Sequence, residues 1–553
     1  MKIGIILDSI KAPWYIYDLV NWIKKDPNLE LEVLLIQNFV NKRKPIFSAG
    51  ISKIIDRILF KIVNILERRL IYKKYSQYIK HFLKYDLRHQ NIKELNVEFD
   101  KSNNGRNFNY NDETINKIKE LNLDIIIRGG SGILTGKILN SSKFGIISFH
   151  HGDNLFNRGG PSGFWEVYEK NPKTGFTIQI LTEQLDGGNV LKRGNFKTEQ
   201  FYQLNQIILT ERSNYYMKTV LKNICKTGSL PPFMKDYPYY NKIYKAPYFV
   251  ESIKYLFNLI YNKFKIYFIN KFFNKVWYVG YQDETFDKLS FYKSKVIENP
   301  KNSFLADPFV VEYKDENYVF VEEYNFKNKK GIISVYNISK DNSQKVGVAL
   351  EENFHLSFPY IFEYKNNYYM SPETRDINEI RIYKCEEFPL KWKYEKTIFK
   401  DIKSTDTIIF SFNNLWWLIT TFSNSGHGNE SELQIFYSNN GPLTDNWISF
   451  KKNPVSIDPS LGRNGGILNH DKKIFRVAQS FGFNSYGEKI NIQEIIKLDP
   501  NNFVEKNYCI VEPKFLKNLI GIHHLHNNKN FTVHDFCKLE LKKFYLFNLL
   551  NYK

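Results

Sequence analysis

The sequence predicts a multidomain protein in which an N-terminal α/β doubly wound domain precedes a C-terminal all-β five-bladed propeller. Its 553 residues are more than one hydrophobic core usually holds. The first two hundred residues alternate strand and helix patterns, and the last part repeats a hairpin pattern about every 50 residues. We expect an α/β domain over 1–200, a helical connector over 201–275 and the propeller over 276–553.

The α/β prediction rests on apolar runs separated by helical patterns. Four runs are typical of buried strands, at 2–8, 29–38, 123–130 and 144–151. Residues 12–26 carry apolar side chains on one helical face, and a helix is also expected over 134–142. Strand and helix in this rhythm favour a parallel sheet, whose ligand crevice lies beyond the carboxyl ends of the strands.

Two histidines stand at the end of the fourth run, in "GIISFHHGD". A histidine there suits a general base near neutral pH, particularly with a carboxylate to orient it. Asp186 lies 36 residues after His150 and precedes a Gly-Gly turn. From spacing alone, His150 and Asp186 are either a catalytic pair or unrelated. The run "RGGSG" lacks the GxGxxG spacing of dinucleotide sites.

The segments "LDIIIRGGSGIL" and "GIISFHHGDNLFNRGGPSGFWEVYEKNPKTGFTIQILTEQLDGGNVL" resemble the formyltransferase catalytic domain of the methionyl-tRNA and sugar N-formyltransferase superfamily. The family pattern is Asn-x-His, Arg-Gly, Thr-Gly-x-Thr and Leu-Asp-x-Gly. The matching positions are Ser148 and His150, Arg158 and Gly159, Thr174, Gly175 and Thr177, and Leu185, Asp186 and Gly188.

This resemblance implies a Rossmann-like formyltransferase fold with 10-formyltetrahydrofolate as co-substrate. It implies a donor site at Gly129, Gly130, Ser131, Gly132, Ile133, Leu134 and Leu185. His150 would deprotonate a substrate amine with support from Asp186, and Ser148 takes the place of the Asn that stabilises the oxyanion. Loss of one such donor typically costs about 10² to 10³ in rate. His151 is expected to point away, since neighbours on a strand face opposite sides.

The propeller prediction rests on five copies of one hairpin plan. Each copy has a polar or small start, an apolar strand, a turn rich in Asn, Asp or Lys, and an aromatic strand. The copies are anchored 51, 48, 58 and 58 residues apart at Pro308, Pro359, Thr407, Gly465 and His523. One blade per repeat is the signature of a propeller.

Charged residues stand where these repeats begin or end. Innermost strands line a propeller axis, so Asp307, Glu373 and Asp406 are expected to meet there and bind substrate, together with His524 or its neighbour His523. The arrangement resembles the five-bladed propellers of arabinanases and invertases, and the propeller of plant glucosamine inositolphosphorylceramide transferases. Three roles remain open for the carboxylates: glycoside hydrolysis, glycan binding, or hydrogen bonds to the backbone. No metal site is expected.

The amino-acid composition of the chain limits which binding partners and which location are expected. The formal charge is +20, but the lysines are spread along the chain without a nucleic-acid-binding signature, so no nucleic-acid partner is predicted. Four scattered cysteines predict neither disulfides nor zinc, and a cytoplasmic location is expected. Residues 248–273 read as an aromatic, Lys-containing helix, which either packs on a neighbour or makes peripheral membrane contact.

Together these patterns predict N-acyl, most specifically N-formyl, transfer to the amine of an amino sugar during bacterial surface polysaccharide biosynthesis. The amino sugar is expected to be nucleotide-linked. The alternative is a glycan-binding or glycan-processing propeller protein with a degenerate formyltransferase domain. A sugar nucleotide or a glycan is the expected partner in either case.

Overall fold

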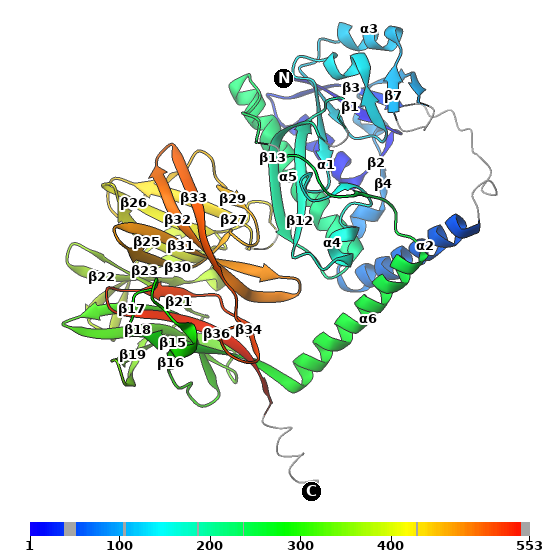
Figure 1. Cartoon of the computed structure of the whole chain (residues 1–553). Coiled ribbons are helices and arrows are strands. Elements are labelled where there is room, and N and C mark those ends of the chain that lie inside the picture. Colours follow the sequence, from blue (N-terminus) through cyan, green and yellow to red (C-terminus); the bar gives the residue numbers. More distant parts are fainter. Residues whose placement is uncertain are drawn as a thin grey trace. The chain divides into compact units, whose positions relative to one another are not determined.

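The computed structural model describes residues 1–37, 51–102, 107–184, 187–235, 237–426, 428 and 430–542 (Figure 1). The chain forms two compact units, Met1–Tyr261 and Asn262–Lys553. The division falls within α6 (Phe249–Phe272). Leu185 and Asp186, two of the predicted site residues, lie outside the described residues.

The first unit is built on a seven-stranded sheet in the order β13-β12-β10-β8-β1-β3-β5. Its strands are β1 (Lys2–Leu7), β3 (Glu30–Gln37), β5 (Lys93–Val97), β8 (Ile125–Arg128), β10 (Ile146–His150), β12 (Lys173–Ile180) and β13 (Asn189–Lys197). The pairs from β5 to β10 are parallel, whereas β12 and β13 add antiparallel strands at one edge. The predicted N-terminal α/β region is therefore confirmed.

Helices and short strands complete this unit. The helices are α1 (Trp14–Lys25), α2 (Ile51–Lys74), α3 (Asp112–Glu120), α4 (Phe164–Tyr168), α5 (Tyr202–Thr227) and α6, with 3-10 turns η2 (Ser76–Phe82), η3 (Arg88–Gln90) and η4 (Gly136–Asn140). The short strands are β2 (Lys11–Pro13), β4 (Lys84–Asp86), β6 (Phe99–Lys101), β7 (Asn107–Tyr110), β9 (Ile133–Thr135), β11 (Arg158–Gly159) and β14 (Ile243–Tyr244).

Apolar spacing explains how α1 covers the sheet. Its residues Ile16, Leu19, Val20 and Ile23 are buried, and they recur at the three- and four-residue intervals of one helical face. The strands β1 and β8 are almost wholly apolar, as expected for parallel strands covered on both faces.

The helix expected over 134–142 is wrong. That segment forms the end of β9 and the five-residue turn η4. Gly136, the first residue of η4, has a φ of +78°, which a right-handed α-helix does not accommodate. The apolar residues Leu134, Ile138 and Leu139 are buried all the same, so a helical spacing of apolar residues occurs here without a helix.

The second unit consists of five antiparallel sheets. In chain order the four complete hairpin sheets are β17-β18-β19-β20, β21-β22-β23-β24, β25-β26-β27-β28 with β29, and β30-β31-β32-β33. The remaining sheet joins both ends of the unit, because β15 (Phe273–Gln282) pairs along its length with β36 (Thr532–Leu541). This sheet also contains β16 (Lys295–Val296), β34 (Leu519–Gly521) and β35 (Leu525–Asn527).

The hairpin strands have the following bounds: β17 (Ser303–Tyr313), β18 (Glu316–Asn325), β19 (Lys330–Ile338), β20 (Ser343–Leu350), β21 (Ser357–Tyr364), β22 (Asn367–Glu373), β23 (Glu379–Glu387), β24 (Lys391–Lys400), β25 (Thr405–Phe412), β26 (Leu415–Thr421), β27 (Glu432–Ser438), β28 (Ile448–Ser449), β29 (Ser456–Ile457), β30 (Arg463–His470), β31 (Lys473–Gly482), β32 (Ser485–Asp499) and β33 (Asn502–Val511). The 3-10 turns are η5 (Phe291–Lys293) and η6 (Arg375–Ile377).

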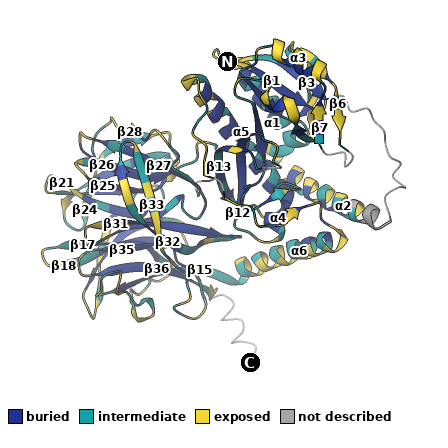
Figure 2. Ribbon diagram, turned by 45° about the horizontal axis from the view of Figure 1, so that its top comes forward, coloured by how far each residue is buried: buried dark blue, intermediate teal, exposed yellow. Residues whose placement is uncertain are grey.

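The first strand of each sheet contacts the first strand of the next. Contacts run from β17 to β21, β25, β30 and β35, and β35 contacts β17 again, so the five sheets close into a ring. Figure 2 shows the buried residues concentrated in these inner strands and the exposed ones at the rims.

A β-bulge recurs near the start of the four hairpin sheets. Register shifts occur after Ala306, Ser357, Thr405 and Asn464. The residue at the bulge has a positive φ: Asp307 at 49°, Phe358 at 47°, Asp406 at 51° and Gly466 at 117°. Such bulges re-aim side chains beside functional sites. The repeat visible in the sequence is therefore a repeated bulge that turns Asp307 and Asp406 inward.

Candidate functional site

The strongest candidate is a buried charged cluster in the ring, which we call the axial cluster: Asp307, Glu322, Glu373, Asp406, Arg463, His523 and Asp535. Its members come from all five sheets. Five carboxyl groups and two potential cations in one dry region are costly unless each is paired or hydrogen-bonded. The partners of each charged group therefore decide whether the cluster can be buried.

Asp307 connects three sheets through its bulge. Its backbone amide donates to Asp535 Oδ2 at 3.2 Å, and its Oδ2 accepts from the backbone amide of Phe358 at 3.2 Å. Its other oxygen, Oδ1, is buried and has no hydrogen-bond partner. The carboxyl group is thus held in place and keeps one oxygen available.

Arg463, the first residue of β30, pairs with two carboxylates from other sheets. Its Nε and Nη2 donate to the carboxylate of Asp406, the latter at 3.3 Å, and Nη2 lies 3.6 Å from Glu373 Oε2. Gln479 Nε2 also donates to Asp406 Oδ2, at 3.1 Å. Asp406 is therefore fully engaged, whereas Glu373 Oε2 accepts no hydrogen bond.

His523 and Asp535 form a second ion pair, with 2.5 Å between His523 Nδ1 and Asp535 Oδ2. The backbone amides of His523 and His524 both donate to Asp535 Oδ1 at 3.0 Å. The Trp277 ring stacks on the His523 ring, with centroids 3.9 Å apart and planes 11° apart. These contacts fix the imidazole, whose Nε2 lies 3.7 Å from Asp307 Oδ1.

Three carboxyl groups of the cluster, those of Asp307, Glu322 and Glu373, have raised pKa values. Burial, with the nearby Asp406 and Asp535, raises the pKa of Asp307 to about 7. Burial, with Asp406 and Asp307, raises the pKa of Glu373 to about 8. For Glu322, burial and the surrounding carboxylates hold the pKa well above its usual value. The like charges thus share protons rather than ionise together.

The pKa of His523, the histidine of the cluster, is shifted in the direction opposite to the one that burial favours. Burial works against the charged imidazolium, but Asp535 and Asp307 outweigh it and raise the pKa of His523 above its usual value. The same pairing lowers the pKa of Asp535, against the effect of its burial. His523 and Asp535 therefore behave as a charged pair, beside carboxyl groups that tend to stay protonated.

A second histidine borders the cluster. The backbone amide of Gly331 donates to His355 Nδ1 at 2.8 Å, which places the ring proton on Nε2. That Nε2 lies 3.6 Å from Glu322 Oε1. His355 is a half-buried donor facing a carboxyl group that has a raised pKa.

The cluster reaches the surface at Tyr486, which is 37% exposed. The Arg463 guanidinium carbon lies 5.2 Å from the centre of the Tyr486 ring, and this ring meets the His523 ring edge-on at 5.2 Å. An exposed aromatic ring next to converging polar groups is typical of a site for a small polar ligand.

Asp307, Glu373 and Asp406, expected from the sequence to meet at the axis, are brought into this cluster by the structure. His524 lies behind it. Its ring is fully buried and packs edge-on against Phe309 and Phe358, and its Nδ1 is 3.7 Å from Asp307 Oδ1. Burial holds the pKa of His524 well below its usual value, so it stays neutral.

Three members were missed from the sequence: Glu322, Arg463 and Asp535. His523, which the sequence offered as the alternative to His524, is the histidine that contacts the carboxyl groups of Asp307 and Asp535. Arg463 stands in "GRNGG", three residues before the bulge residue Gly466, and Asp535 lies within the strand β36. Among the described residues, ligand atoms of Asp307, His523 and Asp535 lie within 4.8 Å of one another, an arrangement that suits a cation.

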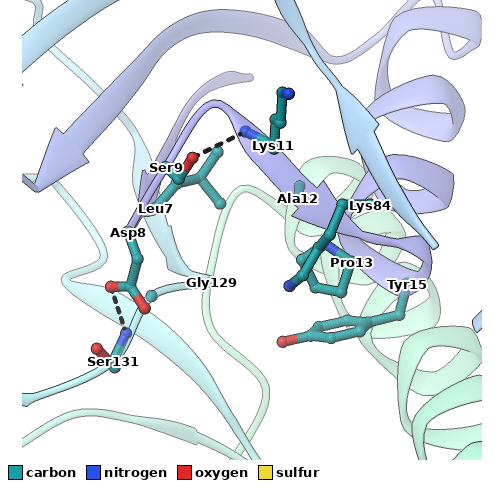
Figure 3. Close-up of a pocket in the computed structure, with 11 residues that line it drawn as sticks. Leu7, Asp8, Ser9, Lys11, Ala12, Pro13, Tyr15, Lys84, Gly129 and Ser131 are labelled. Atoms are coloured by element: carbon teal, nitrogen blue, oxygen red, sulfur yellow. Dashed lines mark hydrogen bonds between the residues drawn. The ribbon is translucent and has the colours of Figure 1, made fainter. Parts of the chain in front are cut away.

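The first unit holds a cavity of about 570 Å³ at the carboxyl ends of β1 and β8 (Figure 3). Gly129, Gly130 and Ser131 line it, and the Ser131 amide donates to Asp8 Oδ1 at 2.8 Å. A side chain on Gly130 would meet Asp8 Oδ1 at 2.9 Å, so the loop needs glycine there. Lys11 and Lys84 give the cavity a cationic wall.

The other residues of the expected donor loop are placed differently. Gly132 has a φ of +85°, and a Cβ there would lie 2.1 Å from the Phe108 ring. Ile133 and Leu134 belong to β9, and Leu134 is buried in the core. These three residues do not appear in the lining of the 570 Å³ cavity.

The predicted base and its neighbours are engaged within the protein. His150 is buried and its Nε2 lies 2.8 Å from the Asn157 carbonyl oxygen. Ser148, 1% exposed, donates to the Phe149 carbonyl oxygen at 3.1 Å. Of the two histidines, it is His151 that lines a second cavity of about 520 Å³, and its Nδ1 lies 3.1 Å from Ser213 Oγ. The His151 ring stacks on that of Phe149, two residues earlier, with centroids 5.4 Å apart, so His151 and His150 face opposite sides as strand alternation predicts.

Comparison with known proteins finds a family match within the second unit. The family model described as glucosamine inositolphosphorylceramide transferase 1, N-terminal, matches residues 293–533. The transferase 1 of that name from rice (Oryza sativa subsp. japonica) is 34% identical over 210 residues, and that of Arabidopsis thaliana is 36% identical over 210 residues. These matches cover 37% of this chain and only 28% and 27% of the two plant proteins.

Weaker matches involve two other groups. The methionyl-tRNA formyltransferase of Clostridium botulinum is 23% identical over 246 residues, which cover 41% of this chain and 76% of that protein. Among solved structures, a thermostable family-43 glycoside hydrolase has 15% identity and a TM-score of 0.34, covering 43% of this chain and 89% of its own. A family 117 glycoside hydrolase from Zobellia galactanivorans has 11% identity and a TM-score of 0.33, covering 48% and 91%.

The predicted formyl transfer from 10-formyltetrahydrofolate to an amino sugar of a bacterial polysaccharide is wrong. The plant relatives that match at 34% and 36% identity carry the name of a glucosamine inositolphosphorylceramide transferase, whereas the formyltransferase match is at 23%. The site geometry agrees, because Ser148 and His150 are both bonded to backbone carbonyl groups and Ser148 is sealed from solvent.

Proposed function

We propose that this chain is a carbohydrate-acting transferase whose second unit, a five-bladed propeller, binds an amino sugar at the axial cluster. The observation that carries the proposal is the excess of carboxyl groups there. Asp307 and Glu373 each keep a buried oxygen without a hydrogen-bond donor. An ammonium group supplies such donors and a positive charge, whereas a neutral hydroxyl supplies only the donor.

The electrostatics of the site support a cationic ligand over an anionic one. Carboxyl groups outnumber the cations Arg463 and His523, and burial together with the like charges already raises the pKa of Asp307 to about 7 and that of Glu373 to about 8. An ammonium group close to them would lower both pKa values and release protons. Binding of an amino sugar is therefore expected to be coupled to proton release.

Tyr486 supplies the apolar part of the site. Its exposed ring, next to Arg463, can stack against the face of a sugar ring while the polar groups beneath it take the hydroxyl and amine substituents. The plant relatives are named after glucosamine, an amino sugar, and this name agrees with the proposed ligand class.

Glycosidic bond cleavage is a second candidate, favoured by one observation. Glu373 has a pKa raised to about 8 by burial and nearby carboxylates, so it is protonated at neutral pH and suits a general acid. Under this candidate, Glu373 would protonate the leaving oxygen while a second carboxylate of the cluster acted as base or nucleophile. Aryl glycosides with a chromogenic leaving group would report this activity.

The first unit has a cavity of its own, and the proposed function assigns it no activity. A 10-formyltetrahydrofolate co-substrate has its only support in the weaker methionyl-tRNA formyltransferase matches and forms no part of the proposed function.

The test is calorimetric titration of the full chain with glucosamine, N-acetylglucosamine and glucose. We expect glucosamine to bind at least about ten-fold more tightly than the two neutral sugars, since one charge-assisted hydrogen bond is worth about 1.5 to 3 kcal/mol. Glu373→Gln should remove most of this preference, and Lys391→Ala, at an exposed site, should not. Equal affinity for the three sugars, or none for any, would overturn the proposal.

A further inference from the structure

The helix α6 carries a stripe of exposed apolar side chains that nothing in the proposed function uses. We call it the α6 stripe, and its members are Val250, Phe257, Ile260, Tyr261, Phe264, Tyr267 and Phe268. They are between 44% and 72% exposed, and Figure 2 shows exposed residues along the whole helix. At 3.6 residues per turn they fall on one face, about a third of the circumference.

The opposite face of α6 is anchored in the first unit. Ser252 and Tyr255 are buried, the Tyr255 hydroxyl donates to Glu67 of α2, and the backbone amide of Tyr202 donates to that hydroxyl at 2.8 Å. Leu259 packs with the apolar cluster between α2 and α5. The stripe is therefore held outward by a firm attachment and is not the loose end of a helix.

Three of the four lysines of α6 border the stripe, and the fourth, Lys271, lies in line with it near the end of the helix. The helix has four lysines and one acidic residue, Glu251, whose carboxylate accepts from the Tyr248 amide at 2.7 Å. By helical spacing, Lys254 and Lys265 border the stripe on one side and Lys263 on the other, and all three are exposed. An apolar face between rows of lysine, with aromatic residues in it, is typical of a helix that lies in a lipid interface.

We infer that the α6 stripe docks this protein onto an anionic lipid surface, with its aromatic side chains among the acyl chains and its lysines at the headgroups. Charge complementarity favours this partner over a second copy of the chain. A two-fold contact through α6 would place lysine rows against each other without acidic residues to pair them. Among the residues that the structure describes, no helix has both the length and the apolar character to span a membrane.

The experiment is co-sedimentation of the full chain with vesicles of phosphatidylcholine alone and of phosphatidylcholine mixed with phosphatidylserine. We expect binding to the mixed vesicles, weakened by added salt because the lysine contribution is screened. The double variant Phe257→Ser/Phe264→Ser should lower the partition coefficient at least about ten-fold, since burying a phenylalanine side chain is worth about 1.5 to 3 kcal/mol.

A matched control removes exposed apolar side chains elsewhere. Tyr292 and Ile496 are 62% and 53% exposed in the second unit, and Tyr292→Ser/Ile496→Ser should leave vesicle binding unchanged. Circular dichroism checks that both double variants fold. Absence of wild-type binding to mixed vesicles, or equal loss in both double variants, would overturn the inference. So would a wild-type dimer in light scattering that the Phe257/Phe264 variant loses.

Discussion

The Arg463 guanidinium donates to Asp406 Oδ1 at 3.3 Å and thereby ties β30 to β25, the first strands of two neighbouring sheets. Asp406 stands at a bulge with a φ of 51°, and this strained backbone aims its carboxylate at the arginine. The same guanidinium lies 3.6 Å from Glu373 Oε2. One buried cation therefore compensates carboxylates from two other sheets. Its removal is expected to destabilise all three sheets.

Replacing Arg463 by Met should strongly destabilise the second unit. The change leaves Asp406 and Glu373 buried without their cation, and breaking a buried pair typically costs about 3 to 5 kcal/mol. Urea unfolding followed by tryptophan fluorescence measures the change. Lys391→Ala, which removes an exposed pair with Glu387, serves as control and should change stability little. A stability loss for Arg463→Met no larger than the control's would contradict the pairing.

Glu373→Gln should flatten the pH dependence of stability in the second unit. The folded-state pKa of Glu373 is raised to about 8 by burial and nearby carboxylates, so the folded state holds the proton more tightly than the unfolded chain does. Its contribution is fully present below the unfolded pKa and is lost as pH rises through about 8. Each pKa unit corresponds to about 1.4 kcal/mol.

Thermal unfolding between acid and mildly alkaline pH checks this. The wild-type midpoint for the second unit should fall as pH rises from about 4.5 to about 8, and the variant's should fall less. Parallel curves for the two proteins would mean that Glu373 titrates normally.

Glu166→Gln offers the same test in the first unit. Burial raises the pKa of Glu166 to about 7, while Asn157 donates to its Oε1 at 3.1 Å. Stability that the protonated carboxyl gives is lost as pH rises through about 7, so the amide should stabilise the unit at pH values above that. Differential scanning calorimetry measures this, with the exposed Glu120→Gln as control. Equal unfolding temperatures above neutral pH in wild type and variant would be the opposing result.

Gly132→Ala should destabilise the first unit far more than Gly228→Ala. Both glycines have positive φ, 85° and 66°, so both substitutions carry the backbone cost of about 1 kcal/mol. At Gly132 the new Cβ would also lie 2.1 Å from the Phe108 ring, whereas nothing lies within 4 Å at Gly228. Chemical denaturation of the two variants separates these effects. Similar losses at both positions would show that the loop relaxes away from Phe108.

Parts of the fold could be predicted because they follow from local patterns. Alternating apolar strands and Asn- or Lys-rich turns predicted the hairpin sheets, and the repeat interval predicted that one sheet follows another. The helix at 134–142 was wrong because Leu134, Ile138 and Leu139 have helical spacing, yet the positive φ of Gly136 prevents a helix. A short strand followed by a 3-10 turn buries its apolar residues at the same spacing as an amphipathic helix would.

Site residues could be predicted from the sequence only where a charged residue stands at the beginning or end of a repeat. Asp307 and Asp406 could be found because each stands at the bulge of its repeat. Glu322 and Asp535 lie within apolar or aromatic strands, and only the closed ring brings them to the other carboxyl groups. The function could not be predicted from the first unit, because motif spacing does not show that Ser148 and His150 are bonded to backbone carbonyl groups.

The most direct test of the account is a crystal structure of the full chain with bound glucosamine. The account predicts the sugar over Tyr486, with its amine within hydrogen-bond distance of the carboxyl oxygens of Asp307 or Glu373 that lack a donor in the free protein. A sugar bound only in the 570 Å³ cavity of the first unit, or an amine turned away from both carboxyl groups, would contradict it.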